Sequence, residues 1–530
     1  MSQRKLPSWC MFFLIARLFC VLQVKCSEDV DVSIKQLHQD VVELIVNLTF
    51  SEYSCDEKFL SVTIDSGEIM ADWKGFDFTS KKLQNMAMAL SPANVRLGGT
   101  SADFLTFDPD GPDSQSKWGK NYVQNKYDSG LFDKSWSKDR KNFTMSGREW
   151  ENMTQFFDLV GWDIIFDFNL FKWKDGLWDP SNAETLLQYS AARGIRLPCF
   201  QLGNEPNAFE HNFNFSISPL VLLSDFRILK MLLARYPLYR YSAIYGPDVT
   251  NLAHHASSMQ YFQEFIEAGA YTVINEASFH HYYMDGSKAQ VFDFLDEDIM
   301  DSLVTGFEIA QSIMVLSPRP LPIRLTETSS CYGGGAPGLS DRYVAGFLWL
   351  DKLGLSALHG ITQVARQTFY GGSYSLISSK LDPNPDFYLS VLYKRLVQGP
   401  VFAISNTPEK LRAYAHCASN KHYPAGALVI YFLNLLPSPV TLKLTQFKDL
   451  DLDLYLLTPG DEEGLKSSSV QLNGQVLQMS GPDLPPLEPR TVTGDVTVEK
   501  HSFGFIVVPK ADVQKCVDYF LSHGENGRSL

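Results

Sequence analysis

Eight short apolar segments alternate with amphipathic stretches between about residues 60 and 395. In 225–236 and 297–313 the apolar residues recur at steps of three and four, which is typical of amphipathic helices. Strands that alternate with helices predict a parallel sheet with helical crossovers, and eight such units predict an α/β chain folded as a (β/α)8 TIM barrel. A doubly wound open sheet is the alternative. The predicted strands are 59–65, 94–100, 162–169, 197–206, 241–249, 277–283, 322–329 and 360–370.

Polar residues gather where these predicted strands end. A buried strand has no structural need to finish in a carboxylate, and TIM barrels carry their active sites at the carboxyl ends of their strands. The sequence therefore predicts that these side chains share one barrel mouth. They are Asp65, Thr100, Asn204, Glu205, Asp248, His280, His281, Tyr282, Glu327 and Gln367.

The pattern changes after residue 395. Helical periodicity stops, and short apolar runs are separated by Pro, Gly and Asp, which is typical of a β-sandwich. We expect this sandwich over 396–530, with residues 27–58 adding an N-terminal strand to it. The apolar runs are 426–434, 440–444 and 503–508.

The catalytic barrel is expected over 59–395, with one interruption. Residues 107–140 are rich in Asp, Gly, Ser and Lys, and they separate the second and third predicted strands by far more than a normal crossover. This composition and length indicate a surface excursion or a removable linker.

The first 26 residues have the pattern of a signal peptide, with Arg4 and Lys5 before an apolar run that Arg17 interrupts. A signal anchor is the alternative. No other long apolar run occurs, so we expect no stable membrane insertion once the leader is removed. N-x-S/T sequons support the secretory route and a secreted, lysosomal and extracellular-matrix location. The candidate glycosylation sites are Asn47, Asn142, Asn152 and Asn214.

Charge and cysteine content exclude some classes of function. A formal net charge of -14 argues against nucleic acid as a partner. A chain with this net charge can still carry a local basic cleft, because the field near a site depends on how the charges are distributed. No cysteine pair has the C-x-x-C spacing of a zinc site, so we expect no metal and no cofactor. Five cysteines lie outside the leader, so at least one thiol is free, and the two that flank the C-terminal β-rich segment are the best disulfide candidates. The five are Cys55, Cys199, Cys331, Cys417 and Cys516.

Two glutamates carry the strongest chemical signal. Glu205 lies in Gly-Asn-Glu-Pro at the end of the fourth predicted strand, and Glu327 lies in Leu-Thr-Glu-Thr-Ser at the end of the seventh. Glycoside hydrolysis needs two carboxyl groups that flank the scissile bond, one of which must hold a proton. A single glutamate is more often a solvated surface residue, but two at apolar strand ends favour catalysis. Asn204 is placed to bond a sugar 2-hydroxyl.

Two further segments are candidates for substrate contact. Because strands alternate faces, either His280 and Tyr282 or His281 and Tyr283 point into the barrel; a buried aromatic layer is the alternative. The glycine-rich segment 332–335 lacks the ending of a phosphate loop, so it predicts a backbone-lined sugar or carboxylate site.

Several strings of residues closely resemble the heparanase family: F-L-S-V-T-I-D, R-L-G-G-T, L-G-N-E-P-N, Y-G-P-D-V, H-H-Y-Y, E-T-S-S-C-Y-G-G-G-A-P and S-V-Q-L-N-G. The resemblance runs from about residue 59 to the C-terminus, apart from the linker. It implies a (β/α)8 barrel with a β-sandwich, and an endo-β-glucuronidase that acts on heparan sulfate. It also implies Glu205 as the proton donor and Glu327 as the nucleophile. The family includes a non-catalytic member, but both carboxylates stand in their motifs here, which favours an active enzyme.

The same resemblance implies a set of substrate contacts and a disulfide between Cys417 and Cys516. The contacts implied by matching are Asp65, Thr100, His280, Tyr332, Gly333, Gly334, Gly372 and Tyr374. The predicted substrate-binding set also includes Asn204, Asn251, Tyr282, Gln367, Lys138 and Lys141.

Heparanases mature by excision of a linker, which leaves two associated subunits. Lys138 aligns with the start of the large subunit, and Trp136 stands where a bulky aromatic residue precedes the cut. The resemblance therefore implies removal of roughly 112–137 and a heterodimer of two fragments of one chain.

Several positions depart from the family pattern. The basic run that follows G-P-D-V in mammalian heparanase is replaced by residues 250–255, Thr-Asn-Leu-Ala-His-His, and the basic residue after H-H-Y-Y is displaced to Lys288. Asn125 and Leu159 stand where a second family disulfide has cysteines. Because Arg and Lys supply most polyanion affinity, less sulfated glucuronides are an alternative substrate, and a weakly catalytic glycan- or receptor-binding protein is a further alternative. His254 and His255 either supply charge in an acidic compartment or are ordinary loop residues.

Overall fold

A computed structural model of the chain describes residues 41–111 and 142–523. The predicted signal peptide, the predicted linker 112–137, Lys138 and Lys141 lie outside these residues. In the described ranges, no helix is both long and apolar enough to cross a membrane.

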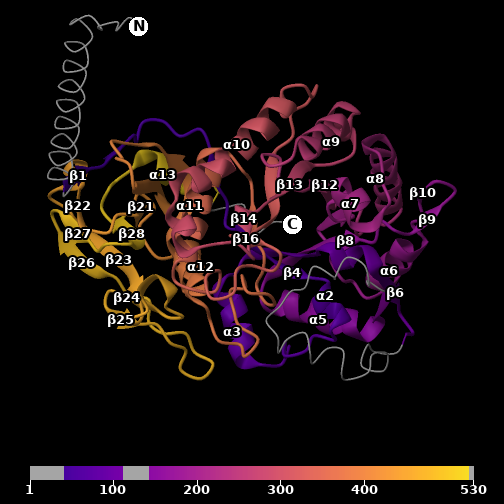
Figure 1. Cartoon of the computed structure of the whole chain (residues 1–530), viewed down its shortest axis with the longest axis horizontal. Coiled ribbons are helices and arrows are strands. Elements are labelled where there is room, and N and C mark those ends of the chain that lie inside the picture. The colour runs from indigo at the N-terminus through magenta and orange to yellow at the C-terminus, as the bar shows by residue number, and fades with distance from the viewer. Residues whose placement is uncertain (1–40, 112–141, 524–530) are drawn as a thin grey trace, which may run out of the picture.

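The eight predicted strands form a closed parallel barrel in chain order, which confirms the TIM barrel and excludes the open sheet (Figure 1). Each strand is followed by a helix on the outside of the barrel. The strands are β4 (Leu60–Asp65), β5 (Ala93–Gly98), β8 (Trp162–Phe168), β11 (Cys199–Leu202), β12 (Ala243–Val249), β13 (Glu276–His281), β15 (Ile323–Thr328) and β17 (Val364–Arg366). The helices are α3 (Lys81–Ala89), α5 (Gly147–Leu159), α6 (Ser181–Ala192), α8 (Pro219–Ala234), α9 (Ala256–Glu267), α10 (Glu297–Met314), α11 (Ala345–Leu358) and α12 (Pro385–Leu396).

Local sequence signals set where the outer helices begin. Ser146 and Glu149 form a reciprocal capping box at the start of α5. Ser218 caps α8, and Pro219 stands at the first helical position, where its missing N–H has no cost. These signals place the helix starts at the barrel mouth, because each follows the loop that leaves a strand's carboxyl end.

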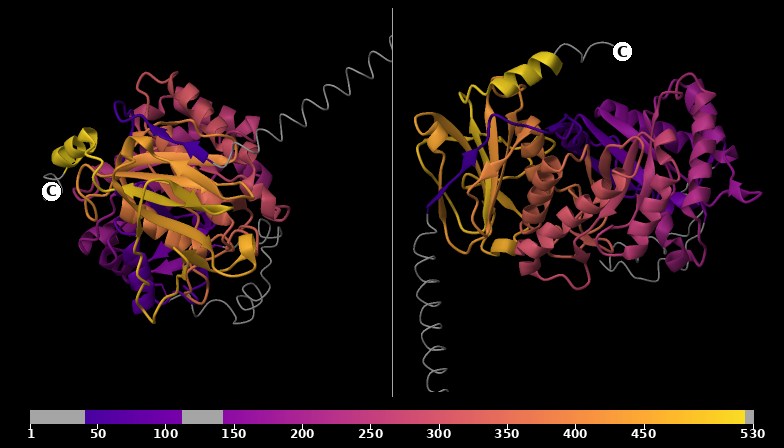
Figure 2. Two further views of the ribbon diagram at one scale, coloured as in Figure 1. Left: turned by 90° about the vertical axis from the view of Figure 1, so that its left-hand side faces the viewer. Right: turned by 90° about the horizontal axis from the view of Figure 1, so that it is seen from above.

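The C-terminal β-rich domain consists mainly of two sheets that pack face to face. A nine-stranded sheet contributes Phe432, Ile430 and Ile506, and a three-stranded sheet contributes Leu442 and Val498, to one buried cluster. The larger sheet contains β25 (Gln475–Val476), β24 (Val470–Leu472), β23 (Asp451–Pro459), β28 (Ser502–Val508), β21 (Leu428–Asn434), β20 (Leu411–Ala418), β18 (Val397–Phe402), β3 (Ser54–Cys55) and β26 (Arg490–Thr493). The smaller contains β1 (Val41–Glu43), β22 (Val440–Lys443) and β27 (Val496–Val498). Figure 2 shows this domain beside the barrel rather than across its mouth.

The N-terminal segment differs from the single strand expected over 27–58. In its described part, residues 41–58, three short strands occur, and each pairs with a different part of the second domain. β1 pairs with β22, β2 (Ile45–Val46) pairs with β19 (Ile404–Ser405), and β3 pairs with β18. The chain turns between them because the segment runs along the edge of the domain and then crosses to the barrel.

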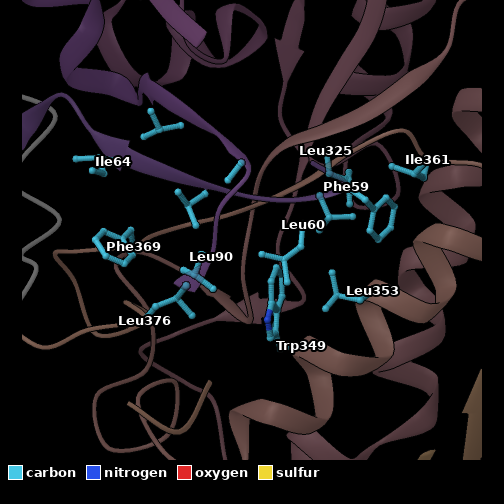
Figure 3. Packing of buried hydrophobic residues seen from close by; sticks show 14 of the residues in the cluster. Phe59, Leu60, Ile64, Leu90, Leu325, Trp349, Leu353, Ile361, Phe369 and Leu376 are labelled. Carbon is cyan, nitrogen blue, oxygen red and sulfur yellow. The ribbon is translucent and has the colours of Figure 1, made fainter. Parts of the chain in front are cut away.

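Helix α11 lies between the two domains and is buried on all sides. Gly354 lets the helix approach β20, since a Cβ atom there would lie 2.4 Å from the Tyr414 ring. On the barrel side, Trp349 and Leu353 of α11 belong to the same buried cluster as Leu60 of β4 and Leu325 of β15 (Figure 3), and Lys352 of α11 bonds Thr328 of β15. Burial of each such apolar side chain stabilises the fold by roughly 1.5–3 kcal/mol. The helix thereby connects the sandwich directly to a strand of the barrel.

Two of the described cysteines form a disulfide, and the asparagines of the predicted sequons lie at the surface. Cys417 of β20 and Cys516 of α13 (Gln514–His523) form a disulfide, the pair that the family resemblance implies. Cys55, Cys199 and Cys331 are free and buried. The four sequon asparagines, Asn47, Asn142, Asn152 and Asn214, are all exposed.

Candidate active site

Glu205 is delivered to the barrel mouth by a strained turn after β11. Gly203 has a φ of 78°, and a Cβ atom there would lie 2.5 Å from Leu170, so only glycine fits. Glu205 itself has a left-handed φ of 54°, a conformation that non-glycine residues adopt rarely and mostly at functional sites. Its backbone N–H donates to the Asp248 carbonyl at 3.0 Å, which ties the turn to β12. The carboxyl group therefore has a defined direction.

Glu327 is the penultimate residue of β15, and both of its carboxylate oxygens are bonded. Arg96 donates from Nη1 to Oε2 at 2.7 Å, and the Tyr282 hydroxyl donates to Oε1 at 2.7 Å. Burial and then the negative charge of Glu327 raise the pKa of Tyr282 well above its usual range, so the phenol remains a donor. The side chain of Glu327 is 11% exposed, which leaves an approach for a substrate.

Arg96, in the middle of β5, is the charged centre of the site. Besides Glu327, its guanidinium donates to Gln201 at 2.7 Å, Asn204 at 2.9 Å and Asp248 at 2.9 Å. Burial opposes its charge, but Asp248, Glu327 and a third carboxylate, Asp167 at 3.4 Å, outweigh burial and raise the pKa of Arg96 above its usual range.

The sequence reasoning did not single out Arg96 as a site residue. The available signal was a charged residue in the interior of an apolar strand, Ala-Asn-Val-Arg-Leu-Gly.

His280 orients the other carboxyl group. Its Nδ1 lies 2.9 Å from Glu205 Oε1, and its Nε2 lies 3.5 Å from Asp248 Oδ2. Burial disfavours the imidazolium, but the charge of Glu327 and the bonds to Asp248 and Glu205 outweigh burial and raise the pKa of His280 to about 10. His280 is therefore a cation at neutral pH. This arrangement also decides the question of faces: His280 and Tyr282 point into the mouth.

The spacing of the two glutamates defines the chemistry. One carboxylate oxygen of Glu205, one of Glu327 and a ring nitrogen of His280 all lie within 4.8 Å of one another. Two carboxyl groups about 5–5.5 Å apart suit a retaining glycosidase, whereas an inverting enzyme needs roughly 6.5–9.5 Å. The same three atoms could surround a metal ion, but an imidazolium has no lone pair for a metal, and Arg96 and Tyr282 already bind both oxygens of Glu327.

The predicted contacts on the Glu327 side come together from three loops. Tyr374 stacks on Tyr282 with 6.3 Å between ring centroids, and Gln367 donates to the Tyr374 hydroxyl at 3.4 Å. The glycine-rich loops meet there, because Ser373 N–H donates to the Gly334 carbonyl at 2.8 Å. Gly333, Gly334 and Gly372 all have positive φ, and Tyr332 is 47% exposed. The structure thus gathers Tyr282, Tyr332, Gly333, Gly334, Gln367, Gly372 and Tyr374 into one wall.

The remaining predicted contacts fall into two groups. Asp65 ends β4 and accepts from Gly67 N–H at 2.6 Å, and Thr100 follows Gly99, whose Cα faces the Asp65 carboxylate. Asn204 and Asn251 each also form hydrogen bonds within the protein. The amide oxygen of Asn204 accepts from Arg96, and the amide nitrogen of Asn251 donates to the Tyr282 carbonyl at 3.1 Å.

The segment that replaces the family's basic run brings little positive charge to the mouth. His254 bonds through its ring nitrogen to the Asn251 amide at 3.3 Å, and partial burial, then the charge of His255, lower the pKa of His254. An acidic compartment therefore protonates His254 less readily than a free histidine. Lys288 is highly exposed and lies 3.7 Å from Asp285, so its charge is partly neutralised.

A (β/α)8 barrel with two such glutamates at its mouth defines a glycoside hydrolase. Residues 68–354 match the family model described as glycosyl hydrolase family 79, N-terminal domain. The chain belongs to this family. Heparanase from Mus musculus is 36% identical over 525 residues, which cover 90% of this chain and 95% of that protein. Hyaluronoglucuronidase from Hirudo nipponia is 32% identical over 487 residues, covering 87% of this chain and 96% of that protein.

Solved structures agree on the fold. A 4-O-α-L-rhamnosyl-β-D-glucuronidase from Fusarium oxysporum superposes with a TM-score of 0.61, covering 88% of this chain and 100% of that one. The two chains are 14% identical, so this likeness concerns the fold alone.

Proposed function

We propose that this chain is a retaining endo-β-glucuronidase that cleaves heparan sulfate, with Glu205 as acid/base and Glu327 as nucleophile. The observation that carries the proposal is the pair of carboxylates, which approach within 4.8 Å and stand in different environments. Glu327 is bonded by two fixed donors, which suits a nucleophile that must be ionised and immobile. Among the described residues, the carboxyl group of Glu205 hydrogen-bonds only to His280, and it is more exposed, with 22% of its side chain accessible, which suits a group that exchanges protons with water.

The residues divide the reaction into two displacements. In the first, Glu327 attacks the anomeric carbon while Glu205 gives its proton to the departing glycosidic oxygen, which forms a glycosyl ester on Glu327. In the second, Glu205 takes a proton from water as the water oxygen attacks the same carbon and releases Glu327. Arg96 and Tyr282 hold the nucleophile in both steps, and His280 orients the acid/base.

The assignment of heparan sulfate is supported by the heparanase-like strings around Glu205 and Glu327 and by the extent of the likeness to curated heparanases. A second candidate is a glucuronide polymer with little sulfate. The missing basic run at 250–255 and the lowered pKa of His254 favour it, as does the likeness to a hyaluronoglucuronidase.

Size-exclusion profiles of heparan sulfate and hyaluronan after incubation at mildly acidic pH distinguish these substrates. Mid-sized heparan sulfate fragments that are absent with Glu327→Ala would support the proposal. Fragments of hyaluronan alone would show that the substrate is hyaluronan and not heparan sulfate. If both polymers stay intact, single glucuronic acid units released from a short glucuronide would indicate an exo-acting enzyme. A chain that binds the polymers without any cleavage would be a glycan-binding protein.

The two carboxylate roles are tested separately from the substrate. With Glu205→Ala, an aryl β-glucuronide that has a good leaving group should still be attacked, whereas the natural alcohol leaving group should lose about 10²–10⁴-fold in rate. With Glu327→Ala, both substrates should fail. Equal losses on both substrates for Glu205→Ala would contradict its role as the acid.

We further propose that excision of 112–137 yields a heterodimer. β6 (Leu105–Asp108) and β7 (Phe143–Ser146) flank this segment and pair in parallel, so both new ends would remain held. The first fragment would contribute β4 and β5 between β17 and β8 of the barrel. Strand pairing rather than a disulfide would hold the fragments, since Cys55 is free. A protein that runs as two bands on a denaturing gel but elutes as one species from a size-exclusion column in native buffer would support this proposal.

A secreted and lysosomal location is proposed from the leader-like residues 1–26 and the exposed sequons. Loss of mass on treatment with an N-glycosidase would support it. An unglycosylated chain that retains residues 1–26 would contradict it.

A further inference from the structure

Lys352 of α11 makes an unusual set of contacts directly behind the active site. The residue is 1% exposed, and its ammonium group reaches the ends of two neighbouring barrel strands. Nζ donates to the Ser329 carbonyl at 2.8 Å and to the Thr328 hydroxyl at 2.5 Å. It also lies 3.2 Å from both the carbonyl oxygen and Nδ1 of His281. One side chain thus joins the carboxyl ends of β13 and β15.

The bonded groups are chain neighbours of the catalytic constellation. His281 lies between His280, which contacts Glu205, and Tyr282, which bonds Glu327. Thr328 follows Glu327 directly. Since side chains alternate along a strand, the outward residues that Lys352 holds determine where the inward residues point.

The strand pairing is irregular at this point. Phe279 pairs with Leu325, but the next residue, His280, pairs with Glu327, so Thr326 is skipped in the register. A bulge re-aims side chains and interrupts the ladder of backbone hydrogen bonds. The contacts of Lys352 fall on the residues just after this bulge, where the ladder alone constrains the strands least.

Charge pairing does not account for a lysine in this position. Within the described ranges Lys352 forms no ion pair with a carboxylate, and its ammonium faces the Tyr283 ring at 4.4 Å. Burial, and then the positive charge of Arg366, lower the pKa of Lys352 well below its usual range. A buried amine without a counter-ion costs stability, so the position favours a lysine through the carbonyls of His281 and Ser329 that it satisfies and not through its charge.

We propose that Lys352 is a positioning residue that clamps the ends of β13 and β15 and so holds His280, Tyr282 and Glu327 in their reactive arrangement. Its kinetic consequence rests on the proposed glycosidase function, whereas its structural consequence does not.

The chain supplies a matched control. Lys394 of α12 likewise donates to backbone carbonyls, those of Leu60 at the start of β4 at 3.2 Å, Glu57 before β4 and Pro92 before β5. These carbonyls lie at the amino ends of β4 and β5, on the barrel face opposite the mouth. Loss of Lys394 therefore removes a comparable clamp without touching the active site.

The kinetic test compares Lys352→Met and Lys394→Met in the full chain on an aryl β-glucuronide. We expect kcat to fall by roughly 10- to 100-fold for Lys352→Met with little change in KM, because a displacement of about 1 Å at the reacting groups has this effect. Lys394→Met should lower the melting temperature but leave kcat within about 3-fold of the wild type. Wild-type kcat in Lys352→Met, or an equal loss in both variants, would overturn the proposal.

A second measurement does not depend on activity. The imidazole of His280, followed by NMR on histidine-labelled protein, should titrate at high pH in the wild type, and its pKa should fall in Lys352→Met as the contacts to Glu205 and Asp248 loosen. An unchanged titration would refute the clamp. If the wild type hydrolyses no glucuronide, the proposed function fails and this titration still decides the inference. If Lys352→Met does not fold, Thr328→Val, which removes one of the bonds, should show a smaller loss of kcat and a smaller titration shift.

Discussion

Replacement of Arg96 by lysine should separate the geometry of the guanidinium from its charge. Arg96 donates to four acceptors at 2.7–2.9 Å, those of Gln201, Glu327, Asn204 and Asp248. A lysine keeps one positive charge but has a single donor centre with three protons, so it cannot span four acceptors that surround a planar fork.

The expected magnitude follows from the lost contacts. If the ammonium keeps the two carboxylates, Gln201 and Asn204 each lose a donor, and an unsatisfied buried acceptor costs about 1–3 kcal/mol. The loss of stability is therefore about 2–6 kcal/mol. If the ammonium instead leaves Glu327, one charge-assisted bond worth about 1.5–3 kcal/mol disappears from the nucleophile, which lowers kcat/KM by roughly 10- to 100-fold.

The assay combines urea unfolding with initial rates on an aryl β-glucuronide. Arg324→Lys is the matched control, because Arg324 is a buried arginine at the amino end of β15 that donates to Glu276 at 2.8 Å. The control should lose stability and keep kcat/KM. If Arg96→Lys retains both wild-type stability and wild-type rates, the guanidinium does not organise the site and the reasoning fails.

Three further predictions concern stability and the acid/base turn. Because the pKa of His280 is raised from 6.5 to about 10 on folding, its stabilising contribution is complete below pH 6.5 and lost as the pH rises towards 10; the difference in unfolding free energy between wild type and His280→Gln should shrink over that range. The Cys417–Cys516 bond closes a loop with a sequence separation of 99, so Cys417→Ser with Cys516→Ser should lower the unfolding free energy by about 5 kcal/mol relative to the oxidised wild type, and the reduced wild type should match the variant. Gly203→Ala should cost about 1–3 kcal/mol or more and reduce kcat, because its new methyl group meets Leu170; full activity with full stability would contradict the strained turn.

Much of the fold could be predicted because its signals are local. The apolar runs and the three- to four-residue periodicity depend on near neighbours, so all eight strands were found, and the barrel follows from their alternation with helices. The boundaries were less accurate. The strand expected over 197–206 ends at Leu202, because the turn at Gly203 and the left-handed Glu205 leave the ladder early.

The N-terminal segment shows that local sequence patterns do not predict long-range strand pairing. One strand is expected over 27–58, but the strands described within 41–55 have partners hundreds of residues away in β18, β19 and β22. Which edge each short piece joins is set by the assembled domain, and the sequence of the segment contains no information about that edge.

The identity of the two glutamates and their place at one mouth were determined by the sequence alone, because strand ends of a parallel barrel converge wherever the chain between them runs. Only the tertiary structure decided which of His280 and His281 enters the mouth, since both satisfy the alternation until a bulge sets the register. It also decided that Arg96 binds partners from β11, β12 and β15, and that Lys352 lies behind them. Charges in a barrel interior act through distance and burial, and both quantities exist only once the strands have closed.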